Sequence, residues 1–139
     1  MSEQKNVKVG DSVSVTRAFS AVDVEAFAAL SGDNNPVHLD AEFAATTQFG
    51  QRVCHGALVT SLFSTLLGTQ LPGEGSIYVS QNSQFRAPVF LDEEVTASVE
   101  VTEINEKRAM VTLKTTVVNA GGKVVVKGEA VMFLPWLKR

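Results

Sequence analysis

Cysteine and histidine are scarce in this chain of 139 residues, which holds one cysteine, Cys54, and two histidines, His38 and His55. A single cysteine excludes an internal disulfide framework, and these few ligands do not form a structural zinc pattern. The composition fits a reducing cytoplasm, which is the expected location. The first six residues are polar and no apolar run follows them, so we expect no targeting sequence.

Blocks of like charge are also missing. The 12 basic and 15 acidic residues are spread along the chain and give a net charge of −3. This pattern argues against nucleic acid or an anionic membrane surface as a partner. No internal repeat or low-complexity tract is present. With 45% hydrophobic residues, the length suits one core, so we expect a single domain over residues 1–139.

The fourteen residues from His55 to Gly68 carry no full charge. As a helix they would span about 21 Å, short of the ~30 Å of a bilayer core, which predicts a buried central helix. A helical period places the large apolar side chains on one side: Leu58, Val59, Leu62, Phe63, Leu66 and Leu67. The other side holds small and hydroxyl residues: Ala57, Thr60, Ser61, Ser64, Thr65 and Gly68. This strip indicates either close packing, with hydroxyls bonded to carbonyls one turn earlier, or the wall of a site.

Before this helix the pattern predicts one strand over 7–15, interrupted by a turn at Gly10-Asp11. A helix then starts at Ser20, which forms a capping box with Asp23, and ends at Gly32. We expect its apolar stripe to contain Phe27 and Leu30, with Val22 or Ala26 one turn earlier. Residues 31–38 predict a shaped loop, and Asp40 is placed to cap a short helix over 41–45.

After Gly75 the apolar period changes to two. The pattern predicts strands over 77–85, 95–101, 110–118 and 123–134, with a hairpin at 119–122 joining the last two. The fold class is therefore α+β, an antiparallel β-sheet wrapped around the apolar helix at 55–68. The last strand is apolar on both faces in places, which predicts a second cover from a dimer partner or from a surface loop.

Asp33 and His38 lie five positions apart in the predicted loop. A carboxylate and an imidazole that converge can hold a water between them, one taking its proton and the other orienting it or delivering a proton to a substrate. The alternative is a turn in which Asp33 caps local amides and His38 only packs. The glycine, asparagine and proline beside them favour a functional loop.

His55 and Gly56 stand where the buried helix begins. The first amides of a helix have no helical partner, so the Gly56 amide can stabilise an oxyanion or a polarised carbonyl oxygen. The alternative is that both are ordinary helix-entry residues. Cys54 beside them is interpreted as a buried, inert thiol.

Together these segments resemble a known family. The motif Ser31-Gly32-Asp33-x-Asn35-Pro36-x-His38 is similar to the hydratase motif of the MaoC-like (R)-specific enoyl-CoA hydratases, which have the hot-dog fold. The resemblance extends through His55-Gly56, the hydroxyl-bearing helix, residues 75–78 and residues 85–89 to nearly the C-terminus. Ala57 departs from it, because many relatives have a larger residue after His-Gly.

The resemblance implies that Asp33 and His38 are catalytic, that the Gly56 amide binds the thioester oxygen, and that Ser64 and Asn35 support the site. It implies hydration of trans-2-enoyl-CoA to (R)-3-hydroxyacyl-CoA without a metal or redox cofactor, coenzyme A being part of the substrate. It also implies a homodimer with the CoA arm near the subunit boundary. Candidates for the CoA phosphates, left unranked, are Arg52, Arg86, Lys107, Arg108 and Lys123.

Rival functions are a hot-dog thioesterase and a non-catalytic acyl-CoA-binding module or subunit of a heterodimeric dehydratase. A thioesterase commonly has an acidic residue on or beside the central helix, and residues 55–68 contain none. A non-catalytic subunit is expected to lose Asp33 or His38, and both are present. A hydratase acting on acyl carrier protein substrates shares all of the chemistry. Acyl-chain length, and whether the product feeds polyester synthesis, β-oxidation or another path, stay open.

Overall fold

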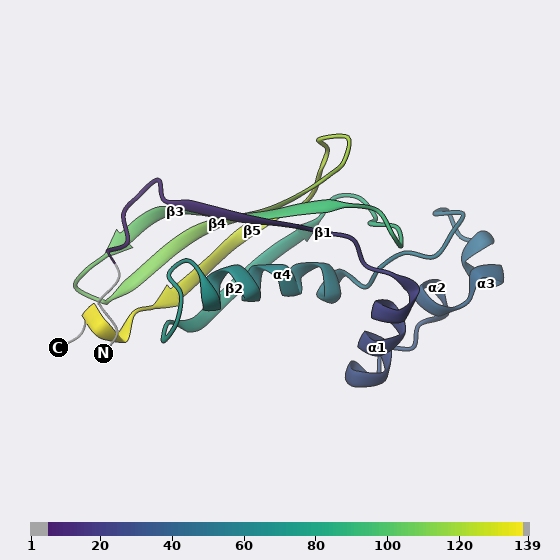
Figure 1. Cartoon of the computed structure of the whole chain (residues 1–139), viewed down its shortest axis with the longest axis horizontal. Coiled ribbons are helices and arrows are strands. Elements are labelled where there is room, and N and C mark those ends of the chain that lie inside the picture. The colour runs from purple at the N-terminus through teal and green to yellow at the C-terminus, as the bar shows by residue number, and fades with distance from the viewer. Residues whose placement is uncertain (1–5, 138–139) are drawn as a thin grey trace.

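The structure, a computed structural model, describes residues 6–137 (Figure 1). The expectation of no targeting sequence rests on residues 1–6, and the first five of these lie outside this range. A five-stranded antiparallel sheet covers one side of a central helix, and three shorter helices lie beyond one end of the sheet. The predicted α+β class is confirmed. The helices are α1 (Ala21–Ser31), α2 (Pro36–Leu39), α3 (Ala41–Ala45) and α4 (Gly56–Thr69), and a 3-10 turn covers Pro135–Leu137.

The sheet has the strand order β1-β3-β4-β5-β2, so β1 and β2 are its edges. The strands are β1 (Ser12–Arg17), β2 (Ile77–Phe85), β3 (Val95–Asn105), β4 (Met110–Asn119) and β5 (Val124–Phe133). The predicted β4–β5 hairpin is confirmed. The first strand begins later than predicted, after the turn at Gly10, and β3 continues past Val101. Pairing shifts between Val101 and Glu103, and this bulge breaks the alternation on which the predicted end of β3 rested.

Helix α4 lies against one face of the sheet, as its uncharged sequence predicts (Figure 1). Five of the six predicted core residues are buried and Leu58 packs against their cluster; the buried ones are Val59, Leu62, Phe63, Leu66 and Leu67. Burial of each such side chain stabilises the fold by about 1.5–3 kcal/mol. Hydroxyls on the opposite face donate to carbonyls one turn earlier, as Ser61 does to Leu58 and Thr69 to Thr65. Among the described residues, no helix is long and apolar enough to cross a membrane.

Helix α1 has the predicted ends but not the predicted stripe. Ser20 accepts from the Asp23 amide while the Asp23 carboxylate accepts from the Ser20 amide, and Gly32 ends the helix at a φ of 84°. The hydrogen bond from the Ser20 backbone is the main cause that lowers the pKa of Asp23. The buried residues of α1 are Val24 and Ala28.

The stripe expected on α1 was wrong, because Val22 and Leu30 are 73% and 87% exposed. The helix lies beyond the end of the sheet (Figure 1), and only its side with Val24 and Ala28 is buried. The predicted loop over 31–38 was also partly wrong. Its last three residues belong to α2, which Asn35 caps and Pro36 begins. The predicted Asp40 cap of α3 is confirmed.

Candidate active site

The loop that joins α1 to α2 is shaped by its own side chains. The Asp33 amide donates to the Ser31 hydroxyl at 3.1 Å, and the Asn35 amide donates to the Asp33 carboxylate at 3.2 Å. The Asn35 side chain in turn accepts from the Val37 amide at 3.1 Å. These turns fix the backbone at Asp33 and occupy only one carboxylate oxygen. Within residues 6–137 the other oxygen has no donor, so it can accept a hydrogen bond from substrate or water.

His38 is held on α2 by a hydrogen bond between its Nδ1 and the Val53 carbonyl at 2.7 Å. A carbonyl only accepts, so Nδ1 carries the proton, and in the neutral ring Nε2 presents its lone pair. The ring of His55 stacks on that of His38, with 3.9 Å between ring centroids. His55 Nε2 donates to the Asp33 backbone carbonyl at 3.0 Å. His55 therefore joins the two predicted catalytic residues.

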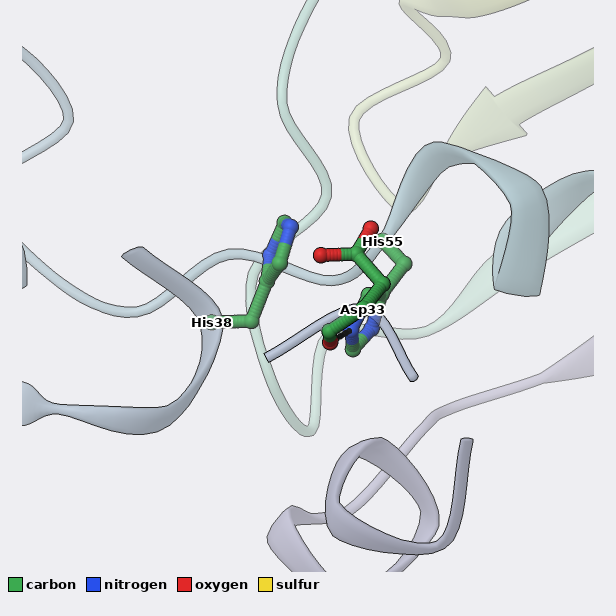
Figure 2. Close-up of side chains that lie close together, drawn as sticks. All are labelled: Asp33, His38 and His55. Carbon is green, nitrogen blue, oxygen red and sulfur yellow. Dashed lines mark hydrogen bonds between the residues drawn. The ribbon is translucent and has the colours of Figure 1, made fainter. Parts of the chain in front are cut away.

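Asp33, His38 and His55 meet at one point, with one nitrogen or oxygen atom of each within 4.8 Å of the others. Figure 2 shows the Asp33 carboxylate directed toward the His38 ring. A water between the Asp33 carboxylate and the lone pair of His38 Nε2 would have an acceptor on each side. It would donate one hydrogen to each and leave a lone pair for attack. The arrangement can therefore hold and activate a water molecule.

Helix α4 begins beside this cluster, and its N-terminus is uncapped. The N-cap residue His55 makes no side-chain hydrogen bond to the first turn, so the Gly56 amide is available to a ligand. A Cβ at Gly56 would lie 2.7 Å from Cε1 of Phe85, whose ring packs over this glycine. Only glycine leaves room here for both the ring and a bound carbonyl oxygen.

A cavity of about 530 Å³ opens next to the cluster and the start of α4. His38 and Gly56 both line it, so a bound thioester could reach the activated water and the free amide together. The walls are mostly apolar. The remaining lining residues are Gln48, Phe49, Val53, Cys54, Val59, Phe85, Arg86, Ala87, Pro88, Val89 and Val126.

The structure brings together Asp33, His38, Gly56 and the supporting Asn35. It does not bring Ser64 to Asp33 within this chain. Ser64 is exposed and lies eight residues beyond Gly56, about 12 Å along the helix, without a hydrogen bond to the described residues. Its supporting role stays a prediction. Of the five phosphate candidates only Arg86 lines the cavity.

Two residues gained a role that the sequence did not assign. The pattern marked His55 only as a first-turn imidazole, yet its ring is 1% exposed and bonds the Asp33 backbone. A polar ring inside an otherwise apolar stretch was the signal that could have identified it. Phe85 belongs to a predicted strand, but nothing in the strand pattern indicates that its ring lies over Gly56.

Cys54 is buried, as expected of an inert thiol, and burial is the main cause that raises its pKa to about 12. Glu93, Asp92 and Asp23 add to the shift. At pH 8 the thiolate fraction is then about 1,000-fold below that of an exposed thiol. We expect iodoacetamide to leave the native protein unmodified and to label Cys54 fully in guanidinium chloride, as read by intact mass. Equal labelling rates in both states would contradict this assignment.

Comparison with known proteins agrees with this geometry. The model of the family described as MaoC like domain matches residues 3–123. The chain is 52% identical to the (R)-specific enoyl-CoA hydratase of Aeromonas caviae, over 94% of this chain and 98% of that protein. It is 44% identical to the protein of the same name from Rhodospirillum rubrum, over 94% and 90%.

Among solved structures, the (R)-hydratase from A. caviae involved in PHA biosynthesis superposes with a TM-score of 0.91 at 51% identity. The match covers 94% of this chain and 99% of that one. The chain therefore belongs to the MaoC-like family and has its hot-dog fold.

Proposed function

We propose that the protein is an (R)-specific enoyl-CoA hydratase, which adds water to trans-2-enoyl-CoA and gives (R)-3-hydroxyacyl-CoA. The observation that carries this proposal is that Asp33 and His38 converge near the uncapped Gly56 amide, and that His38 and Gly56 line one cavity. Two relatives that are 52% and 44% identical to this chain have this name. The site residues and the similarity to these relatives therefore both support a hydro-lyase.

In the proposed mechanism the thioester carbonyl accepts a hydrogen bond from the Gly56 amide. This bond polarises the conjugated alkene and makes C3 electrophilic. Water held by Asp33 and His38 forms the new C–O bond at C3, and the alkene electrons move toward the thioester oxygen. The pair takes one proton from the water and returns one to C2.

Two features disfavour the rival functions. Helix α4 has no carboxylate to serve as the base or nucleophile of a thioesterase. A non-catalytic acyl-CoA-binding subunit has no need of the bonds that aim His38 and Asp33 at one point. Hydration requires no group besides these residues, so we also propose that the enzyme uses no metal or redox cofactor. A single cysteine, Cys54, that forms no disulfide supports a cytoplasmic location.

The test follows the conjugated-alkene absorbance of short trans-2-enoyl-CoA substrates together with free thiol. We expect the absorbance to fall without thiol release. Thiol release would replace the hydratase by the thioesterase, and tight binding without turnover would replace it by a binding module. A parallel series with enoyl groups on acyl carrier protein compares the two carriers by kcat/KM.

We further propose that the protein is a homodimer joined through β2. This edge strand is exposed on nearly its whole length, and its large apolar side chains are open: Ile77, Tyr78, Val79 and Phe85 are 51%, 41%, 48% and 56% exposed. The other edge, β1, exposes serine, threonine and arginine instead. A long apolar edge strand that stays unpaired promotes aggregation, so a second copy of β2 is its natural cover.

Val79→Glu is expected to convert the dimer to a monomer, because it places a charge in the middle of the proposed apolar contact. Light scattering coupled to size exclusion measures the mass, and far-UV circular dichroism checks that the variant is folded. Val9→Glu is the matched control, since Val9 is 63% exposed and precedes β1, the sheet edge opposite β2. A wild-type monomer, or a folded dimer of Val79→Glu, would contradict the β2 interface.

A further inference from the structure

Arg52 is a half-buried cation next to the catalytic helix α2. Its side chain is 19% exposed, and its Nε donates to the His38 backbone carbonyl at 2.7 Å. Its Nη2 is buried and makes no hydrogen bond within the described part of the chain. The nearest carboxylate belongs to Glu25 on α1, at 3.9 Å, and the Glu25 side chain is 63% exposed.

Stability alone does not account for this arrangement. Burying most of a guanidinium carries a desolvation cost, and an apolar side chain of similar size often serves stability better. The pair with Glu25 contributes little, because its 3.9 Å separation is long and the mostly exposed Glu25 carboxylate is screened by solvent. What remains is the charge-assisted hydrogen bond to one carbonyl, and that carbonyl belongs to His38.

The next residue holds the same helix from a second side. The Val53 carbonyl accepts the proton of His38 Nδ1 at 2.7 Å, and the Val53 amide donates to the Val37 carbonyl at 3.3 Å. Residues 52 and 53 therefore hold the backbone and the ring of His38 together. Helix α2 has four residues and cannot hold its own last turn rigidly, so its geometry depends on these outside bonds.

We infer that Arg52 is a positioning residue of the hydration reaction: through Nε it fixes the His38 carbonyl and thereby aims the His38 ring at the water. This inference rests on the proposed function. Loss of the bond lets α2 rotate, and a displacement of about 1 Å at a catalytic group costs up to 100-fold in rate. Because Arg52 does not line the cavity, substrate binding should change little.

Two substitutions of matched length separate the hydrogen bond from the charge. In Arg52→Gln the side-chain nitrogen takes the place of Nε and keeps a donor, whereas Arg52→Met has the same length and no donor. We expect Arg52→Met to lower kcat about 10-fold to 100-fold with KM within about 3-fold, and Arg52→Gln to stay within about 3-fold of the wild-type kcat. Arg52→Lys keeps the charge but not the donor position, so it should resemble Arg52→Met. Glu25→Gln should leave kcat within about 2-fold.

NMR spectroscopy tests the effect of the Arg52–His38 hydrogen bond without enzyme turnover. The proton on His38 Nδ1 is held to the Val53 carbonyl and should give a slowly exchanging resonance in imidazole-selective ¹⁵N NMR. Its exchange should accelerate at least about 10-fold in Arg52→Met and stay slow in Arg52→Gln, if a fixed backbone is what protects it. Thermal unfolding checks that the variants are folded, and Arg52→Lys replaces Arg52→Met if the latter is not.

The outcomes are distinct. If wild-type protein does not hydrate enoyl-CoA, the proposed function fails, and the NMR comparison still tests the contact. If wild-type hydrates but Arg52→Met keeps full kcat, or Arg52→Gln loses as much as Arg52→Met, the positioning role is wrong. Full activity of Arg52→Lys with low activity of Arg52→Gln would show that the charge matters and not the hydrogen bond, which also overturns the inference.

Discussion

Asp33→Asn is expected to lower kcat/KM for enoyl-CoA hydration by about 10²- to 10⁴-fold, the range of a lost acid–base group. Asparagine has the same shape, and its Oδ1 can still accept from the Asn35 amide, so the loop keeps its turn. The amide cannot take a proton from the bound water at neutral pH. The loss therefore lies in the chemical step, and substrate affinity should stay close to that of wild-type.

The measurement is a progress curve of enoyl absorbance over a range of substrate concentrations. Glu42→Gln is the matched control, because it removes an exposed carboxylate from the neighbouring helix α3 without touching the cluster. It should hydrate at the wild-type rate. An Asp33→Asn variant that is folded and retains more than about a tenth of wild-type kcat/KM would remove Asp33 from the catalytic pair.

Gly56→Ala is the second large effect, with an expected fall in kcat of about 10²- to 10³-fold, as for loss of one oxyanion donor. The new Cβ would lie 2.7 Å from Phe85 Cε1 and 3.1 Å from its Cδ1. The ring has to move, and because Phe85 and Gly56 both line the cavity, the movement disturbs the space beside the Gly56 amide. Gly56→Ala should therefore lower kcat strongly and lower the free energy of unfolding much less.

Gly68→Ala on the same helix is the control, since a Cβ there meets nothing within 4 Å. It should stay active and gain up to about 1 kcal/mol in free energy of unfolding from helix propensity. Steady-state kinetics and urea unfolding of both variants provide the comparison. Wild-type kcat in Gly56→Ala would mean that the start of α4 does not bind the thioester oxygen.

Features with a local cause could be predicted from the sequence. The helical spacing of large apolar residues in the uncharged segment of α4 identified its buried side. Capping residues located the starts of α1 and α3. Alternation located β2, β4 and β5 to within about one residue. The candidate site at Asp33, His38 and Gly56 was predicted from the loop residues together with the resemblance to the MaoC-like family, and the structure places these residues beside one another.

What the sequence did not predict depends on contacts between distant segments. The buried side of α1 is set by where α1 overhangs the sheet, and a period alone cannot decide this for a helix with apolar residues all round. The bond from His55 to the Asp33 carbonyl spans 22 positions, and that from Arg52 to the His38 carbonyl spans 14. Neither leaves a periodic pattern in the chain.

The decisive measurement is the chirality of the 3-hydroxyacyl-CoA that purified wild-type protein forms from a short trans-2-enoyl-CoA. Water bound by Asp33 and His38 attacks C3 from one face only, so a single enantiomer should form. We predict the (R)-product, with no free coenzyme A and with formation abolished in Asp33→Asn. An (S)-product, a racemic mixture or hydrolysis of the thioester would contradict the proposed function.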